Sequence, residues 1–240
     1  MLNDFTGAEM AALLQLMKPM SARFTALLFD VDGTLIDSND AHAAAWVRAF
    51  TEHHVGVDPA LVRRCIGMGG DKLMPAVSGI EEDSPDGRAI AKRRGEIFTS
   101  EFLPTLRPFR DAGALVSAIK SRGLTAVAAS SAQKDELKKL LAIAGADWLM
   151  DAATSSDDAD ESKPAPDIIH AALDRAKALP AHALMIGDTP YDVEAARRAG
   201  VKTIAFRCGG WSDHDLDGAI AIYDGPWDLL KEIEASPILR

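Results

Sequence analysis

The feature that most constrains this chain is a repeated alternation between short apolar runs and longer stretches with helical spacing. Apolar runs of strand length lie at residues 25–29, 125–129, 148–150, 183–186 and 202–206. Helical patterns, several of them closed by a glycine, lie at residues 111–122, 133–144, 167–178 and 191–199. Strands that alternate with helices form a parallel sheet with helices on both faces. The sequence therefore predicts an α/β fold with a doubly wound parallel sheet.

The alternation is interrupted by helical stretches without convincing strands. This segment, residues 37–105, is predicted to be a small α-helical cap domain inserted after the first strand. Residues 23–36 and 106–240 then form the α/β core. Residues 1–22 carry apolar side chains at helical spacing and predict an N-terminal helical extension.

Composition narrows the classes of function. The chain has 240 residues and a formal net charge of -10, which is unfavourable for general binding of nucleic acid or anionic membranes. No apolar run reaches membrane-spanning length. The two cysteines, Cys65 and Cys208, are no disulfide framework, and the N-terminus lacks the basic start of an export signal. These features predict a cytoplasmic protein.

Polar side chains follow the predicted strands where ligands of parallel sheets gather, beyond the carboxyl ends. The candidates are Asp30, Asp32, Ser130, Ser131, Lys163, Asp188 and Asp192. Two carboxylates about 4 Å apart repel by about 4 kcal/mol at an effective dielectric of about 20. Three or four together require a cation, and a ligand set of oxygens alone favours Mg²⁺. The sequence therefore predicts a Mg²⁺ site at this edge of the sheet.

The same residues suit phosphoryl transfer. Asp30, directly after the first strand, is the candidate nucleophile, and Asp32 suits general acid and base work. Ser130 and Ser131 can hold phosphate oxygens, as can Lys163 with its point charge. Ser131 is more typical of a helix N-cap than of a phosphate contact. Asp192 has two open interpretations, a metal ligand or the capping-box partner of the following helix.

These stretches resemble the motifs of the haloacid dehalogenase superfamily of phosphotransferases. The sequence DVDGTL is similar to the first motif, AASS to the second, SKPAPD to the third and GDTPYD to the fourth, in the same order. The resemblance covers residues 24–230. The helical insert resembles the cap of the group that contains phosphoglycolate-phosphatase-like and β-phosphoglucomutase-like enzymes.

The resemblance implies a role for each motif residue. Asp30 would be the nucleophile and Asp32 the acid/base, with phosphate held by Ser130 and Lys163. Mg²⁺ would be bound by Asp30, the main-chain carbonyl of Asp32, and Asp188, with Asp192 in support. The cap is expected to close over the substrate, hinging near residues 36–38 and 103–108.

The resulting hypothesis is a Mg²⁺-dependent phosphatase acting on a small phosphorylated metabolite, as a monomer or homodimer. The alternative is a β-phosphoglucomutase-like sugar phosphomutase. That group carries an arginine in the cap loop to anchor a distal phosphate, and Gly70 stands at this position here. His42 is the one feature that favours the mutase. A non-catalytic scaffold is expected to have lost one of the motif residues, and none is missing.

Weaker candidates lie in the predicted cap. The glycine-rich stretch at residues 67–72 predicts a loop that reaches the catalytic edge, with Gly69, Gly70 and Lys72 as candidate substrate contacts. An exposed lysine beside Asp71 is the simpler interpretation of Lys72. Arg94 is expected on a solvated helix face.

Overall fold

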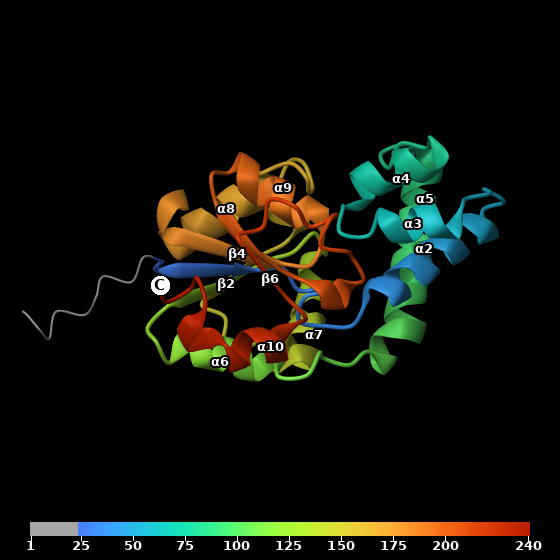
Figure 1. Ribbon diagram of the computed structural model, residues 1–240. Coiled ribbons are helices and arrows are strands. Elements are labelled where there is room, and N and C mark those ends of the chain that lie inside the picture. Colours follow the sequence, from blue (N-terminus) through green and yellow to red (C-terminus); the bar gives the residue numbers. More distant parts are fainter. Residues whose placement is uncertain (1–23) are drawn as a thin grey trace, which may run out of the picture.

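A single parallel sheet occupies the centre of the computed structural model, which describes residues 24–240 (Figure 1). The predicted helical extension at residues 1–22 therefore lies outside the described residues. The strands are paired in the order β3-β2-β1-β4-β5-β6. Their bounds are Ala26–Phe29 for β1, Thr125–Ala129 for β2, Ala152–Thr154 for β3, Ala183–Gly187 for β4, Lys202–Phe206 for β5 and Ala221–Tyr223 for β6. The order reverses at β1, between β2 and β4, which places a crevice at the carboxyl end of β1.

Helices cover both faces of the sheet (Figure 1). One face carries α8 (Asp167–Ala176) and α9 (Pro190–Arg198), and the other carries α6 (Ala112–Lys120), α7 (Lys134–Ala144) and α10 (Pro226–Lys231). The buried side chains of β1 alternate between them, because successive residues of a strand point to opposite faces. Leu28 packs in the α8–α9 layer, and Leu27 and Phe29 pack in the opposite one. The predicted doubly wound α/β fold is confirmed.

Two details of the sheet differ from the sequence-based expectation. Residues 148–150 form no strand; the chain turns there, with the N–H groups of Leu149 and Met150 both bonded to the Ala146 carbonyl. Trp148 is 76% exposed, so its aromatic side chain gives an apolar signal without a buried site. The strand forms later, where Ala152 comes into register with Val127. The edge strand β6 was not predicted, because three half-buried residues give little pattern.

The remaining helices lie together beside the sheet, at the right of Figure 1. They are α2 (Asn39–Glu52), α3 (Pro59–Arg64), α4 (Gly70–Ser78) and α5 (Pro85–Ile97). Two segments join them to the sheet and run side by side, with Ile36 bridged to Pro108 and the Asp37 N–H donating to the Arg107 carbonyl at 3.1 Å. We call residues 37–105 the helical insert. Its role as a cap domain stays a prediction.

Within residues 24–240, no helix combines the length and the apolar character that crossing a membrane requires.

Candidate active site

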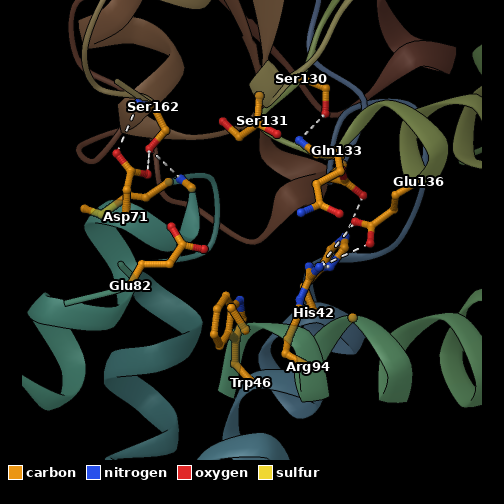
Figure 2. A pocket seen from close by; sticks show the side chains of 18 of the residues that line it. His42, Trp46, Asp71, Glu82, Arg94, Ser130, Ser131, Gln133, Glu136 and Ser162 are labelled. Carbon is orange, nitrogen blue, oxygen red and sulfur yellow. Dashed lines mark hydrogen bonds and ion pairs between the residues drawn. The ribbon is translucent and has the colours of Figure 1, made fainter. Parts of the chain in front are cut away.

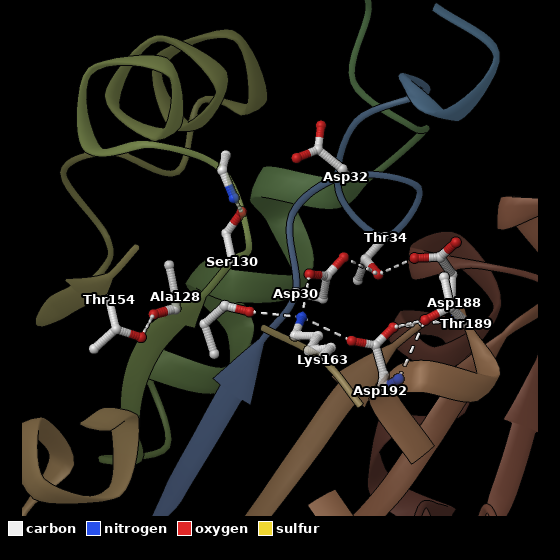
Figure 3. A network of polar contacts seen from close by, with 12 residues as sticks. Asp30, Asp32, Thr34, Ala128, Ser130, Thr154, Lys163, Asp188, Thr189 and Asp192 are labelled. Atoms are coloured by element: carbon white, nitrogen blue, oxygen red, sulfur yellow. Dashed lines mark hydrogen bonds and ion pairs between the residues drawn. The ribbon is translucent and has the colours of Figure 1, made fainter. Parts of the chain in front are cut away.

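Lys163 lies at the centre of a buried polar cluster beyond the end of β1 (Figure 3). Its side chain is 1% exposed. The ammonium donates to Asp30 Oδ1 at 2.6 Å and to the Ala129 carbonyl at 2.9 Å, and it lies 2.8 Å from Asp192 Oδ1. Burial alone would lower the pKa of Lys163, but the two carboxylates outweigh it and raise the pKa above its ordinary value. Lys163 therefore stays charged, with two hydrogen bonds and one further ion pair to surrounding oxygens.

Asp30 follows β1 directly, and its backbone N–H bonds the Ile186 carbonyl of β4 at 2.9 Å. This bond fixes the residue at the crevice between the two strands. Burial raises the pKa of Asp30 to about 7, although the Lys163 charge opposes the shift. Asp188, from the end of β4, is fully buried and accepts from Thr34 Oγ1 at 2.8 Å and Asn39 Nδ2 at 2.9 Å. Burial and the charge of Asp30 raise the pKa of Asp188 well above its usual range.

Three of the predicted carboxylates come together as expected. One oxygen from each of Asp30, Asp188 and Asp192 lies within 4.8 Å of the others. The set consists of oxygens only, which suits a hard divalent cation such as Mg²⁺. Asn39 Oδ1, next to this cluster, is buried and accepts no hydrogen bond from the described residues. The donor chemistry of the site therefore fits Mg²⁺.

Of the two interpretations of Asp192, the capping box is confirmed, and the role as a metal ligand stays a prediction. Its Oδ2 accepts from the Thr189 N–H and hydroxyl at the start of α9, which forms the predicted capping box. Its Oδ1 faces Lys163 and belongs to the carboxylate cluster. The capping box at the start of α9 thereby holds Asp192 Oδ1 in the carboxylate cluster.

Asp32 lies apart from the carboxylate cluster and points to the helical insert (Figure 3). Its Oδ1 accepts from Ser38 Oγ at 2.6 Å and contacts His42 Nε2 at 2.7 Å. Burial pushes the pKa of Asp32 upward, but His42 and Ser38 outweigh that effect, and the pKa falls below its ordinary value. Asp32 is therefore an ionised carboxylate held by two donors.

The tautomer of His42 follows from its second partner. Arg94 of α5 bonds His42 Nδ1, and a guanidinium can only donate, so Nδ1 is the acceptor and Nε2 carries the proton. Arg94 also donates to Glu136 Oε2 at 3.2 Å, and Phe98 stacks on the imidazole with 4.0 Å between ring centroids. The expectation of a solvated Arg94 is wrong: the side chain is 18% exposed, because it turns inward between these groups.

The two serines after β2 differ in their partners. Ser130 is buried, and its hydroxyl accepts from the Ala132 N–H at 3.0 Å. The Ser131 hydroxyl is buried without a hydrogen-bond partner among the described residues. The expectation that Ser131 caps the next helix is wrong, since α7 begins at Lys134 and Gln133 holds the N-cap position. Ser131 instead lines the cavity described next.

A cavity of about 1500 Å³ lies between the carboxyl end of the sheet and the helical insert (Figure 2). Asp30, Asp32 and Ser130 line one part of it, and Gly69 and Gly70 line another. The stretch predicted as a loop is one only over residues 67–69, since α4 begins at Gly70, but it reaches the cavity, where the Gly69 N–H donates to Ser162 Oγ at 3.0 Å. Lys72 is not among the lining residues, and its ammonium pairs with Glu161 at 2.5 Å. Its contact with substrate stays a prediction.

Three positions that support Asp188 were not identified in the sequence. Asn39 Nδ2 bridges Asp188 Oδ2 and the Gly209 carbonyl, and Thr34 holds the other carboxylate oxygen. A side chain at Gly209 would collide with the Asp188 carboxylate. Thr34 lies in the motif that was singled out, and the paired glycines after β5 were a signal of close approach. Nothing in the sequence alone indicates Asn39.

The carboxylate cluster and the buried lysine lie at the switch point of a doubly wound sheet. This is the place at which α/β enzymes with such a sheet bind their ligands. The chain matches the family model of haloacid dehalogenase-like hydrolases over residues 27–206. It belongs to the haloacid dehalogenase-like hydrolase family. The predicted superfamily and the assignment as a hydrolase are thereby confirmed.

Several relatives are phosphatases by name. The phosphoglycolate phosphatase of Aquifex aeolicus is 30% identical over 74% of this chain and 82% of its own length. The fructose-1-phosphate phosphatase of Escherichia coli is 26% identical over 78% of this chain and 99% of its own length. Among solved structures, a hydrolase from Pseudomonas syringae superposes with a TM-score of 0.82 at 26% identity, covering 88% of this chain and 98% of that one.

Proposed function

We propose that this protein is a Mg²⁺-dependent phosphatase that hydrolyses a small phosphomonoester through a phosphoryl intermediate on Asp30. The observation that carries the proposal is the buried cluster of Asp30, Asp188 and Asp192 around Lys163, with Asp32 beside it. The names of the phosphatase relatives support the same reaction class.

The residues divide the reaction into two steps. In the first, an Asp30 oxygen attacks phosphorus, the phosphorus–oxygen bond of the ester breaks, and Asp32 gives a proton to the leaving oxygen. In the second, Asp32 takes a proton from water and the water oxygen attacks phosphorus. The bond between phosphorus and the Asp30 oxygen then breaks, which releases inorganic phosphate and restores the Asp30 carboxylate. Ser130 and Ser131, which line the cavity, would hold the non-bridging oxygens, and the buried Lys163 would add its positive charge.

Bound Mg²⁺, held by Asp30, Asp188, Asp192 and the Asp32 carbonyl, would offset the charge of the phosphate beside these carboxylates. Without a ligand, Asp32 is ionised and paired with His42, which suits the base of the second step. A dianionic phosphate next to Asp32 raises its pKa by like-charge repulsion and thereby favours the acid needed in the first step.

Hydrolysis of p-nitrophenyl phosphate with Mg²⁺ tests the proposal. We expect turnover that EDTA and Asp30→Asn abolish and that Asp147→Asn, which changes an exposed acid outside the cavity, retains. Acid quench followed by peptide mass spectrometry should find phosphate on Asp30. Turnover that persists in Asp30→Asn, or phosphate on another residue, would overturn the proposal.

The phosphomutase alternative keeps one observation in its favour, the 2.7 Å contact between His42 and Asp32, because a mutase also needs a positioned acid/base. The two reactions differ in product. Incubation with β-glucose 1-phosphate yields inorganic phosphate if the protein is a phosphatase and glucose 6-phosphate if it is a mutase.

A further inference from the structure

The part of the cavity that faces away from the catalytic edge is acidic. Among the side chains that line the whole cavity, ten are Asp or Glu and four are Lys or Arg; eight of these acids remain when Asp30 and Asp32, at the catalytic edge, are left out. Glu82, from the loop between α4 and α5, and Trp46, from α2, lie on the insert side, across the cavity from Ser130 and Ser131 (Figure 2). The leaving group of a substrate whose phosphate sits at Asp30 would extend toward them.

From this arrangement we infer that Glu82 selects the leaving group. The substrate class is a phosphomonoester whose organic part carries hydroxyl or amine donors and no second anionic group. This inference rests on the proposed phosphatase function and adds the specificity of the same site.

Glu82 differs from the neighbouring Asp71 in its partners. The Asp71 carboxylate is occupied by the Ser162 hydroxyl and N–H (Figure 2). Glu82 is half-buried, and no described residue donates a hydrogen bond to its carboxylate. Burial and the charge of Asp71 raise the pKa of Glu82 above its ordinary value. A carboxylate that is partly removed from water without donors gains from a ligand that supplies them.

Gly70 provides the space that Glu82 occupies. A side chain at Gly70 would collide with Glu82 Oε1, so the carboxylate reaches its position because residue 70 has none. This is the position at which the resemblance to mutases would place an arginine for a distal phosphate. The cavity therefore presents a negative charge where a second phosphate would need a positive one.

The cations of the cavity do not reverse this preference. Arg94, the half-buried one, already donates to Glu136 and His42. Arg88, Lys92 and Lys139 are exposed, and water screens exposed charges. Glu82 therefore favours substrates whose organic part carries hydrogen-bond donors and disfavours those with a second anionic group.

Competing substrates test the inference with the full chain and Mg²⁺. The panel is glucose 6-phosphate for hydroxyl donors, glucosamine 6-phosphate for an added amine, and phosphoglycolate and glucose 1,6-bisphosphate for a second anion. We expect kcat/KM to be higher for the two sugar monophosphates. Glu82→Gln should lower their preference over phosphoglycolate about 10-fold, mainly through KM, because a charge-assisted hydrogen bond is lost. Glu82→Lys should invert the preference.

Asp86→Asn, which removes an exposed charge outside the cavity, should leave the preference unchanged. An equal preference in wild type, Glu82→Gln and Glu82→Lys would overturn the inference while p-nitrophenyl phosphate turnover still supported a phosphatase. Loss of all Mg²⁺-dependent turnover in the wild type would instead overturn the proposed function. Equal loss on every substrate in both Glu82 variants would assign Glu82 a structural role.

Discussion

Lys163 is the residue on which the acidic cluster depends. Its ammonium is the one protein cation in contact with Asp30 and Asp192 among the described residues, and all three side chains are buried. Removing one partner of a buried ion pair leaves an uncompensated charge, which costs about 3–5 kcal/mol. Lys163 therefore contributes to the stability of the fold and is also part of the candidate site.

The first prediction concerns Lys163→Met. We expect the free energy of unfolding to fall by about 3–5 kcal/mol in EDTA, and Mg²⁺ to recover part of it by replacing the lost positive charge. Urea unfolding with and without Mg²⁺ measures both effects. Lys134→Met, at an exposed position, serves as the control. Equal stability of the Lys163 variant and the wild type would contradict the prediction.

The second prediction concerns pH. In the metal-free protein burial raises the pKa of Asp30 to about 7, so below pH 7 a proton must leave before the carboxylate can bind Mg²⁺. We expect the apparent Mg²⁺ affinity to fall as the pH drops below about 7, by up to about tenfold per unit. Calorimetric titration with Mg²⁺ between about pH 5.5 and about pH 8 measures this affinity. An affinity independent of pH would count against the raised pKa of Asp30.

The same shift affects folding in the metal-free state. The folded pKa lies above the unfolded one, so the folded state holds more protons between them, and this group's contribution to stability is lost as the pH rises from about 4 to about 7. Mg²⁺ should reverse the trend.

At the scale of elements, the turn after β5 shapes the carboxylate cluster without adding a side chain to it. It comprises Arg207–Gly209, and its last residue leaves room for the Asp188 carboxylate. Asn39, the first residue of α2, ties the Gly209 carbonyl to Asp188. The Asp188 carboxylate, at the end of β4, is thus held in place by the start of α2 and by the turn after β5.

The third prediction concerns Gly209→Ala. The added methyl group would displace Asp188, so we expect Mg²⁺ affinity to drop at least about tenfold, since positions that orient metal ligands have effects of that size. Calorimetry with Mg²⁺ measures the change directly. Gly56→Ala is the matched control, because nothing lies within 4 Å of a methyl group there. Equal affinities in both variants would show that the turn does not position Asp188.

At the scale of the whole molecule, several hydrogen bonds join the helical insert to the core. Tyr191 Oη donates to the Arg64 carbonyl at 2.6 Å, and Arg63 donates to the Gly209 carbonyl at 2.8 Å. Ser162 also bonds the Gly69 N–H. Each contact joins a segment of the insert to a segment of the core, as closure over a substrate would require.

The fourth prediction is that Tyr191→Phe combined with Ser162→Ala favours a more open arrangement. Both changes remove hydrogen bonds between insert and core, each contributing about 1 kcal/mol, while the sheet is untouched. We expect a larger radius of gyration by small-angle scattering without ligand and a higher KM for p-nitrophenyl phosphate. Identical scattering profiles for variant and wild type, with and without a phosphate analogue, would argue against closure of the insert.

The sequence by itself determined the fold class and the edge of the sheet at which the polar residues gather. Parallel strands bring their carboxyl ends to one side, so Asp30, Asp188 and Lys163 could be placed together from their positions after apolar runs. Expectations were less accurate where the signal was weak. Trp148 is apolar yet exposed, and β6 is short and half-buried.

Only the tertiary structure decided what surrounds those residues. Asn39 and Gly209 act through contacts between segments 170 positions apart. Arg94 turns inward because His42 and Glu136 lie beside it, and Glu82 faces the cavity because Gly70 lacks a side chain. Local patterns encode strands, helices and turns, since these depend on neighbours in the chain. Charge partners and steric gaps depend on neighbours in space, which the packing of the insert against the sheet creates.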